Sequence, residues 1–302
     1  MRRGWKLAVS SLLALSMLLA GCAQQKDDNK PDASISPKSA RTFGSDTYMA
    51  ELKTKGKIVI GVKFDVPQFG SLNPATTLPE GFDVDLGNII AESIGVKAEF
   101  VEALSKNRIP FLNEDKVDLI ISTMTINEER KTQIDFSNVY YIAEQRLLVA
   151  KNSKIKDASS LESQKANVCT AKGSTSEKNV RAIAPSAVLT LQDGYSQCFQ
   201  LLQNEQADAV TTDDVILVGL LKNDPKNFKL TGDPFSKEPY GMGIKKGRVG
   251  FVEFINEVLT DVKKDGTWEK LYDKWVKPLT GTSEKPPPDT ATAEGPTPKP
   301  SV

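Results

Sequence analysis

The stretch VDLIISTMTINEER, residues 117–130, decides the fold of this chain. Its first part, Val117–Ile121, is a mostly apolar run flanked by polar residues, which is typical of a core strand in a parallel sheet. Hydroxyl side chains follow at once, at Ser122, Thr123 and Thr125. Because ligands of open α/β sheets bind where such strands end, we expect a binding site at this point.

The residues after this strand predict the start of a helix. Thr125 and Glu128 have the spacing of a capping box, so a helix should begin near Thr125 with its free N–H groups facing the sheet edge. Such a terminus favours an anion, and Arg130 on the first turns is placed to grip a carboxylate with two parallel hydrogen bonds. The alternative is a surface arginine after an ordinary strand-to-helix loop.

The composition argues against several classes of function. The 302 residues are enough for two domains of ordinary size. Lys plus Arg and Asp plus Glu number 39 each, so the chain has no strongly basic field to hold nucleic acid. The sequence contains no histidine, which removes His-based catalytic triads and most zinc sites, and we expect neither a metal nor a cofactor.

The N-terminus carries a secretory signal. Basic residues precede an apolar run from Leu7 to Ala20 that is too short for a comfortable membrane span. Leu19-Ala20-Gly21-Cys22 resembles the bacterial lipoprotein lipobox, in which the cysteine is acylated and becomes the mature N-terminus. We therefore expect a signal peptide at 1–21, palmitate on Cys22 and a flexible tether at 22–41. The alternative is a plain signal peptide with an incidental cysteine.

Two further features suit an exported protein. Cys169 and Cys198 are expected to form a structural disulfide, because two free thiols are less common in an oxidising compartment. The tail at 280–302 contains Pro286-Pro287-Pro288 and further prolines, which predicts a disordered segment. Function is therefore expected between residues 42 and 279.

The pattern between these ends predicts strands that alternate with helices in two α/β units. A β-branched alternation indicates a strand at 57–62, and apolar residues at helical spacing indicate a helix that stops at Gly95. Two lobes built on parallel sheets are the economical interpretation, although the pattern does not assign the last helices to either lobe. Further strands are expected at 97–101, 146–150, 167–170, 188–191, 207–211 and 240–245, and further helices near 110, 174, 197, 214, 249 and 268.

Several motifs follow one another in a fixed order: GFDVDL at 81–86, VDLIISTMT at 117–125, ER at 129–130, DFS at 135–137, YY at 140–141, GSTSE at 173–177, ADAV at 207–210 and YGMGI at 240–244. The set resembles the polar amino-acid solute-binding proteins (family 3) of bacterial ABC importers, in particular glutamate/aspartate-binding lipoproteins. The resemblance implies an α/β, two-lobed, periplasmic-binding-protein-like fold (type II), with parallel-sheet lobes joined by a two-segment hinge. Lobe 1 would comprise 42–142 plus 240–279, and lobe 2 would comprise 143–239.

The resemblance also implies roles for individual residues. Ser122, Thr123, Thr125 and Arg130 fall on family positions that hold the α-carboxylate and α-ammonium groups of the ligand. Thr175 falls on the carboxylate contact of lobe 2.

The residues of lobe 2 agree with this picture. Ser174 and Glu177 have a capping-box spacing, so lobe 2 should also offer a helix N-terminus to an anion. Asp213 falls on the family carboxylate that receives the ammonium group. Its alternative role is the N-cap of the following helix, a position that favours Asp.

Two cationic residues affect which amino-acid side chain the site is expected to accept in its ligand. Lys63 follows the first strand at a position where relatives that bind cationic amino acids carry an acidic residue. Asn107-Arg108-Ile109-Pro110 resembles the segment by which aspartate and glutamate binders place an arginine on the distal carboxylate. Lys63 and Arg108 therefore favour an acidic amino acid, glutamate first. If both are solvated charges instead, glutamine is the better ligand.

The expected function is that of a monomeric, lipid-anchored receptor on the extracytoplasmic face of the cell membrane. It would capture an acidic L-amino acid and deliver it to the permease subunits of an ABC importer, without changing the ligand chemically. Closure of the two lobes would follow from higher affinity of the ligand for the closed form. An enzyme that resembles cyclohexadienyl dehydratase and an amino-acid sensor are the rival interpretations.

Overall fold

The computed structural model describes residues 40–296, and these lie within one compact unit. The predicted signal peptide, Cys22 and most of the predicted tether fall outside the described residues, as do residues 297–302. Within the described part, no helix has the length and apolar character that a membrane span requires.

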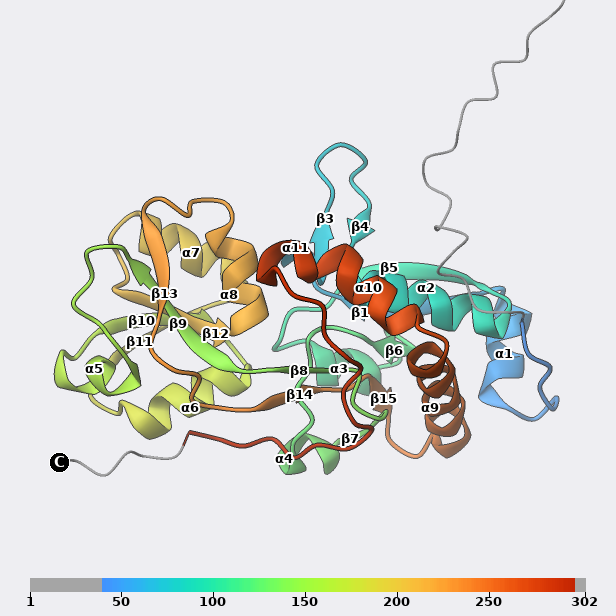
Figure 1. Ribbon diagram of the computed structural model, residues 1–302. Coiled ribbons are helices and arrows are strands. Elements are labelled where there is room, and N and C mark those ends of the chain that lie inside the picture. The colour runs from blue at the N-terminus through green and yellow to red at the C-terminus, as the bar shows by residue number, and fades with distance from the viewer. Residues whose placement is uncertain (1–39, 297–302) are drawn as a thin grey trace, which may run out of the picture. The chain divides into compact units, whose positions relative to one another are not determined.

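The first lobe is built on a five-stranded sheet whose order is β5 (Lys97–Glu102), β1 (Lys57–Val62), β6 (Leu119–Ile120), β15 (Gly243–Lys245) and β7 (Ile134–Phe136). β1 runs parallel to β5 and β6, whereas β15 is antiparallel to β6 and β7. The chain therefore returns to the first lobe for its last strand, after it has built the second lobe (Figure 1).

The last long helices pack on the first lobe, which the sequence pattern did not assign. α9 (Val249–Lys264) contacts α1 (Tyr48–Lys55) and α2 (Phe82–Ile94), and α10 (Thr267–Trp275) contacts α2. α2 ends as predicted at Gly95, whose φ of 87° lies in the left-handed region that glycine tolerates best.

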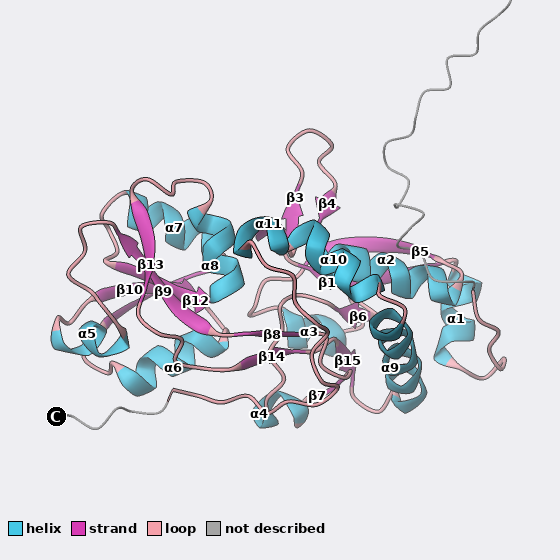
Figure 2. Ribbon diagram, viewed as in Figure 1, coloured by secondary structure: helices cyan, strands magenta, loops and turns pink. Residues whose placement is uncertain are grey.

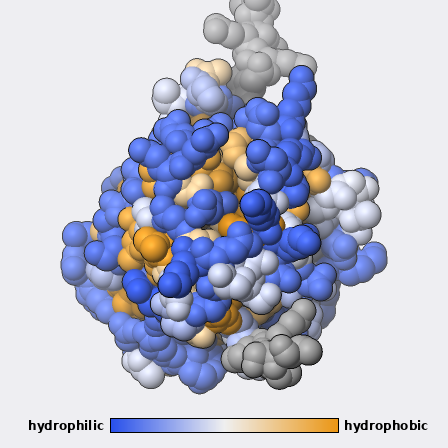
Figure 3. Space-filling model, turned by 90° about the vertical axis from the view of Figure 1, so that its left-hand side faces the viewer, coloured by the Kyte–Doolittle hydropathy of each residue, from blue (hydrophilic) through white to orange (hydrophobic). Residues whose placement is uncertain are grey.

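The second lobe repeats the architecture. Its five-stranded sheet has the order β11 (Val188–Gln192), β10 (Asn167–Ala171), β12 (Ala209–Asp213), β9 (Gln145–Ala150) and β13 (Phe228–Thr231). β10 is parallel to β11 and β12, and β9 is antiparallel to β12 and β13. Hydrophilic residues cover most of the molecular face on this side, with hydrophobic residues between them (Figure 3). The helices of this lobe are α5 (Ala158–Ser163), α6 (Thr175–Ile183), α7 (Tyr195–Gln203) and α8 (Asp214–Leu221).

Two short strands connect the lobes. β8 (Tyr141–Ala143) leads into the second lobe and β14 (Glu238–Tyr240) leads out of it, and the two pair antiparallel (Figure 2). The single strand expected at 240–245 is therefore two strands, one in this hinge and one, β15, in the first sheet. Shorter elements complete the fold: β2 (Asp65–Val66), β3 (Gly70–Leu72), β4 (Pro79–Glu80), α3 (Arg108–Asn113), α4 (Glu128–Lys131) and α11 (Lys277–Thr280).

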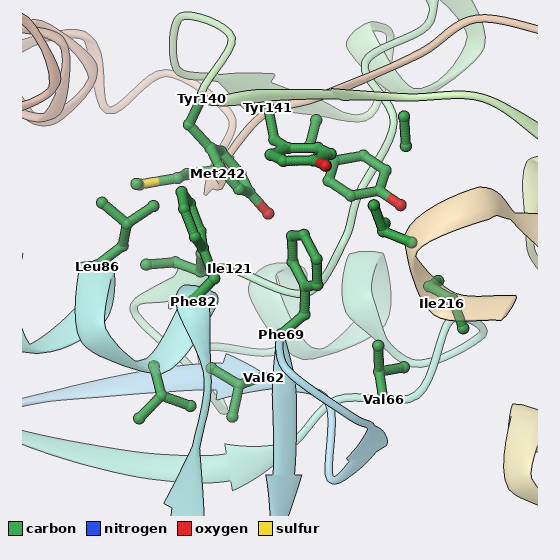
Figure 4. Packing of buried hydrophobic residues seen from close by; sticks show 14 of the residues in the cluster. Val62, Val66, Phe69, Phe82, Leu86, Ile121, Tyr140, Tyr141, Ile216 and Met242 are labelled. Carbon is green, nitrogen blue, oxygen red and sulfur yellow. The ribbon is translucent and has the colours of Figure 1, made fainter. Parts of the chain in front are cut away.

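The largest hydrophobic cluster continues from the first lobe into the hinge. Phe69, Phe82, Tyr140 and Tyr141 are at most 6 % exposed and lie with their rings close together (Figure 4). The Phe69 ring lies 5.1 Å from the ring of Tyr141 in an edge-to-face arrangement, a geometry that aromatic rings prefer. These aromatic residues therefore fix the hinge strand β8 to the core of the first lobe.

The predicted disulfide is present. Cys169 on β10 and Cys198 on α7 are bonded, with their Cα atoms 5.3 Å apart. The bond joins a central strand of the second lobe to a helix that packs on it.

The helix at the end of the stretch 117–130 begins later than predicted. α4 starts at Glu128, and its cap is Asn127, whose side chain accepts a hydrogen bond from the Arg130 N–H. Thr125 does not cap this helix, because its backbone forms a β-bridge with Tyr240 and its hydroxyl donates a hydrogen bond to the Glu238 carboxylate. The expectation of a capping box at Thr125 was wrong, since a contact distant in sequence takes Thr125 out of the helix start.

The C-terminal segment differs from the disordered tail that the prolines predicted. Residues 286–296, the C-terminal strap, lie along the molecule: the Val139 N–H donates to the Asp289 carbonyl at 2.8 Å, and Lys237 and Glu294 exchange two backbone hydrogen bonds of 2.9 and 3.1 Å. The Lys263 ammonium donates to the Val139 and Pro287 carbonyls and to the Asp289 carboxylate. A proline-rich sequence can therefore be ordered here, because partners outside it satisfy its backbone.

Candidate functional site

Arg130 lies between the two lobes and is 8 % exposed. Its guanidinium donates to the Thr125 carbonyl of the first lobe at 2.7 Å and to the Gly173 carbonyl of the second lobe at 3.3 Å. Burial, and next the nearby charge of Arg108, lower the pKa of Arg130 to about 9. The side chain therefore remains a cation at neutral pH, and it is not the surface arginine of the alternative interpretation.

Hydrogen bonds to other residues of the first lobe fix the loop that follows β6. The Ser122 hydroxyl donates to the Ala103 carbonyl at 2.9 Å, so this hydroxyl is committed within the lobe. The Thr123 N–H donates to the Asp83 carboxylate at 2.9 Å, and Thr123 has a φ of 43°, an uncommon value for a residue with a side chain. Burial raises the pKa of Asp83 to about 7.

Arg108 is buried beneath the same loop. Its NH1 group donates to the carbonyls of Ser122 and Thr123 at 2.9 and 3.1 Å, and its Nε group donates to the Ser105 carbonyl at 3.2 Å. Burial lowers the pKa of Arg108. Arg108 is therefore not a solvated charge. Its Nε and NH1 groups are used to hold backbone carbonyls of the first lobe.

Lys63 directly follows β1 and is fully buried. Its ammonium donates to the Ser105 hydroxyl at 2.8 Å and lies 5.6 Å from the centre of the Tyr195 ring, which belongs to the second lobe. Burial, and next the charge of Arg108, lower the pKa of Lys63 to about 7. The charge of this side chain therefore changes close to neutral pH.

Thr125 and Thr175 come from opposite lobes and meet at one carboxylate. Both hydroxyls donate to Oε2 of Glu238, at 2.6 and 2.8 Å, and the two hydroxyl oxygens are 3.5 Å apart. Glu238 is the first residue of the hinge strand β14 and is 2 % exposed. Thr175 opens α6, which Ser174 caps as predicted by accepting from the Glu177 N–H.

Asp213 ends β12 and lies near the same boundary. Its Oδ2 atom accepts a hydrogen bond from the Tyr240 hydroxyl, while its buried Oδ1 atom has no hydrogen-bond partner within the described chain. Burial, and next the charge of Glu238, raise the pKa of Asp213 well above its ordinary value. Asp213 occupies the N-cap position of α8 but makes no capping bond with its side chain, so the alternative role has no support from the geometry.

The site thus combines cations and carboxylates in one buried region. Arg108 interacts electrostatically with Lys63, Arg130 and Asp213, so it is the charge that these side chains share. Among residues 40–296, no group of three or more His, Cys, Asp or Glu side chains is arranged to hold a metal ion. Buried charges of both signs are suited to a ligand that itself carries both.

Further contacts join the lobes around this region. The Asp65 carboxylate of the first lobe accepts from the Tyr195 N–H of the second at 2.6 Å, at the start of α7. Lys106 pairs with Asp193 at 2.5 Å, and Lys178 pairs with Glu129. The structure therefore represents a form in which the lobes touch.

The family model for bacterial extracellular solute-binding proteins, family 3, matches residues 58–278. The chain belongs to this family. The solute-binding protein resembles the ABC transporter glutamine-binding protein GlnH of Bacillus subtilis, with 42% identity over 280 residues, which cover 92% of this chain and 98% of the relative. It is also 43% identical, over 250 residues, to the glutamine-binding protein of Geobacillus stearothermophilus, with 80% and 93% of the two chains covered.

Solved structures agree with this assignment. An ancestral arginine-binding protein, solved with arginine and also with glutamine, matches with a TM-score of 0.70 and 38% identity, covering 73% of this solute-binding protein and 98% of the other chain. The predicted family and the predicted two-lobed α/β fold are therefore confirmed.

Sequence reasoning did not identify three residues of this region. Glu238, Asp83 and Tyr240 each make a buried hydrogen bond to a predicted site residue or to its loop. Asp83 and Tyr240 lie in the motifs quoted for the resemblance, which was the available signal. Glu238 precedes such a motif, and nothing in its sequence context distinguishes it from an exposed acidic residue.

Proposed function

We propose that this solute-binding protein captures L-glutamine and delivers it to an ABC importer. The observation that carries the proposal is that Arg130 and Asp213 are both buried and interact electrostatically in one region. Arg130 has spare N–H donors for an α-carboxylate, and the unpartnered Oδ1 atom of Asp213 is an acceptor for an α-ammonium group. An amino-acid zwitterion supplies both partners.

The choice of glutamine over glutamate rests on Lys63 and Arg108. A second ligand carboxylate needs a permanent, available cation, but Arg108 uses three hydrogen bonds on backbone carbonyls and the pKa of Lys63 is about 7. An amide needs only hydrogen-bond donors and leaves both charges as they are. The two similar glutamine-binding proteins support the same choice. Glutamate is the second candidate, favoured by the net positive charge of this pair.

Calorimetry across pH separates the two candidates. Above a pH of about 7, glutamate would have to bind together with a proton for Lys63, so its affinity would fall by up to about tenfold per pH unit. Glutamine carries no second charge, and its affinity is expected to stay nearly constant between about pH 7 and 8. Tighter binding of glutamate, with a pH dependence that Lys63→Met removes, would replace glutamine by glutamate in this proposal.

Closure of the lobes is the proposed signal to the permease. Ligand charges that are buried between the lobes favour the closed form, and the permease then recognises a shape that the free protein seldom adopts.

We further propose that Cys22 carries a lipid anchor. The anchor would keep the receptor, as a monomer, at the extracytoplasmic face of the cell membrane. A Cys22→Ala variant that stays membrane-bound in cells would contradict the anchor.

An enzyme and a sensor are the rival functions. Dehydration of a small cyclic acid calls for an acid or base placed at the substrate, without an amino-acid clamp. Turnover of candidate cyclic acids by the purified protein would favour the enzyme. Glutamine uptake that is unchanged in cells lacking the protein would favour the sensor.

A further inference from the structure

Helix α7 of the second lobe begins without a capping side chain at its N-cap position. The N-cap is Gly194, and the Gln197 side chain accepts hydrogen bonds of 3.2 Å from the N–H groups of Asp193 and Gly194. The first N–H groups of a helix have no partner within the helix itself. The N–H of Tyr195, the first residue of α7, therefore needs an acceptor from another segment.

The first lobe supplies this acceptor. Oδ2 of Asp65, on the short strand β2, accepts a hydrogen bond of 2.6 Å from the Tyr195 N–H, although the two residues are 130 positions apart. The other oxygen of this carboxylate is buried and has no hydrogen-bond partner within residues 40–296. A carboxylate at a helix N-terminus is stabilised by the free N–H groups and by the helix dipole. Asp65 thus caps a helix of the opposite lobe.

Gly194 leaves the space that this carboxylate occupies. A Cβ atom on Gly194 would lie 2.4 Å from Oδ2 and 3.2 Å from Cγ of Asp65. The backbone does not itself require glycine here, because a φ of −130° and a ψ of 162° lie in the extended region that any residue adopts. The missing side chain therefore serves the approach of the two lobes.

The residues that follow Asp65 also pack on the second lobe. Strand β2 contacts both α7 and α8. Val66 and Ile216 of α8 belong to one buried cluster (Figure 4). Pro67 lies against Gly219 of α8, where an added Cβ atom would be 3.2 Å from the proline ring. The cap from Asp65 is therefore part of a contact that closes as a unit when the lobes meet.

We propose that Asp65 and Gly194 form a latch that favours the closed form of the protein. In the closed form the Asp65 carboxylate caps α7, and opening of the lobes returns both groups to water. The proposal rests on the proposed capture of an amino acid by lobe closure. Asp65 then raises ligand affinity through the closed fraction rather than through a ligand contact, because apparent affinity scales with the fraction of protein that is competent to bind.

Removal of the carboxylate tests the latch. Asp65→Ala is expected to weaken glutamine binding by about threefold to thirtyfold, the loss of one capping carboxylate, mainly through faster dissociation. Asp157→Ala is the matched control, because Asp157 caps α5 within the second lobe and accepts from the Ser160 N–H at 2.9 Å. The control should lower stability but keep the affinity within about twofold of the parent. Equal affinity changes in the two variants would overturn the proposal.

The contact with Gly194 provides a test that a merely structural role would not pass. Gly194→Ala places a methyl group against the carboxylate and should weaken glutamine by about tenfold in the parent protein. In an Asp65→Ala background the nearest remaining atom of residue 65 is the Cβ at 3.9 Å, so the same change should cost less than about twofold. Equal losses in both backgrounds would show that the methyl group disturbs α7 itself, and would overturn the latch.

Exchange of the Tyr195 amide proton, followed by NMR, reports the latch in the ligand-free protein. This proton is expected to exchange at least about threefold more slowly in the parent than in Asp65→Ala, whereas the Ser160 amide should exchange equally in both. Equal Tyr195 rates in the two proteins would contradict the cap. If no amino acid binds the parent protein, the proposed function fails, while this comparison still decides the role of Asp65.

Discussion

Single residues set the chemistry of the site through what they leave unpaired. Arg130 spends two of its five N–H donors on backbone carbonyls from the two lobes and keeps the rest. Asp213 keeps one carboxylate oxygen without a partner among the described residues. A buried polar atom without a partner is costly, so Asp213 is stabilised when a complementary ligand binds.

Replacement of Arg130 by alanine is expected to weaken amino-acid binding by about a hundredfold or more. Truncation of one partner of a buried, hydrogen-bonded charge pair costs about 2 to 5 kcal/mol. Isothermal titration calorimetry measures the loss. Lys131→Ala is the control, because the Lys131 side chain is half exposed and pairs with exposed Glu128. The affinity of this variant should stay within about twofold of the parent protein. Unchanged binding by the Arg130 variant would remove the carboxylate role.

At the scale of elements, helix starts decide where polar groups point. Ser174 caps α6. The Glu177 carboxylate accepts a hydrogen bond of 2.9 Å from the N–H of Gly173, one residue before the cap. This arrangement fixes Thr175 at the first position of the helix, toward Glu238 of the hinge. A local sequence signal therefore positions a side chain that makes a contact distant in sequence.

The disulfide between β10 and α7 is expected to stabilise the second lobe by about 3 to 4 kcal/mol, the chain-entropy value for a loop of this length. Its two cysteines are 29 positions apart. A Cys169→Ala/Cys198→Ala double variant should show a lower urea midpoint, with the free energy of unfolding reduced by that amount. The same midpoint in parent and variant would contradict the expectation. Thiol labelling of the denatured, unreduced parent should find neither cysteine free.

At the scale of the molecule, the C-terminal strap lies beside the hinge. It bonds Val139 just before β8 and Lys237 just before β14, so it touches the chain at the entrance to both hinge strands. The strap lies beyond the matched part of the family model, which ends at residue 278. Its contacts are therefore a feature of this chain that the family pattern does not describe.

Lys263→Met is expected to release the strap and lower the free energy of unfolding by about 1 to 2 kcal/mol, because three hydrogen bonds of one ammonium group are lost. Limited proteolysis should then cut faster within residues 286–296. Exposed Lys264→Met is the matched control and should match the parent protein. Equal cleavage rates in both variants would show that Lys263 does not hold the strap.

Prediction from sequence succeeded where the signal is local. The cap at Ser174, the stop at Gly95 and the strand at 57–62 follow from residues adjacent to the feature itself. It failed at Thr125, where a bridge to Tyr240 replaced a plausible capping box. It also missed Glu238, because burial of an acidic residue depends on donors that lie elsewhere in the chain.

The sequence by itself determined the alternation of strands and helices and the two α/β units, since periodicity and turn residues act over a few positions. The family came from the resemblance that the ordered set of motifs carries. Only the tertiary structure decided which donors and acceptors remain free at the boundary between the lobes. Arg108 meets three carbonyls, the threonine hydroxyls meet Glu238, and Asp213 keeps an open oxygen. Hydrogen-bond pairing between distant segments fixes these outcomes, and no local pattern encodes it.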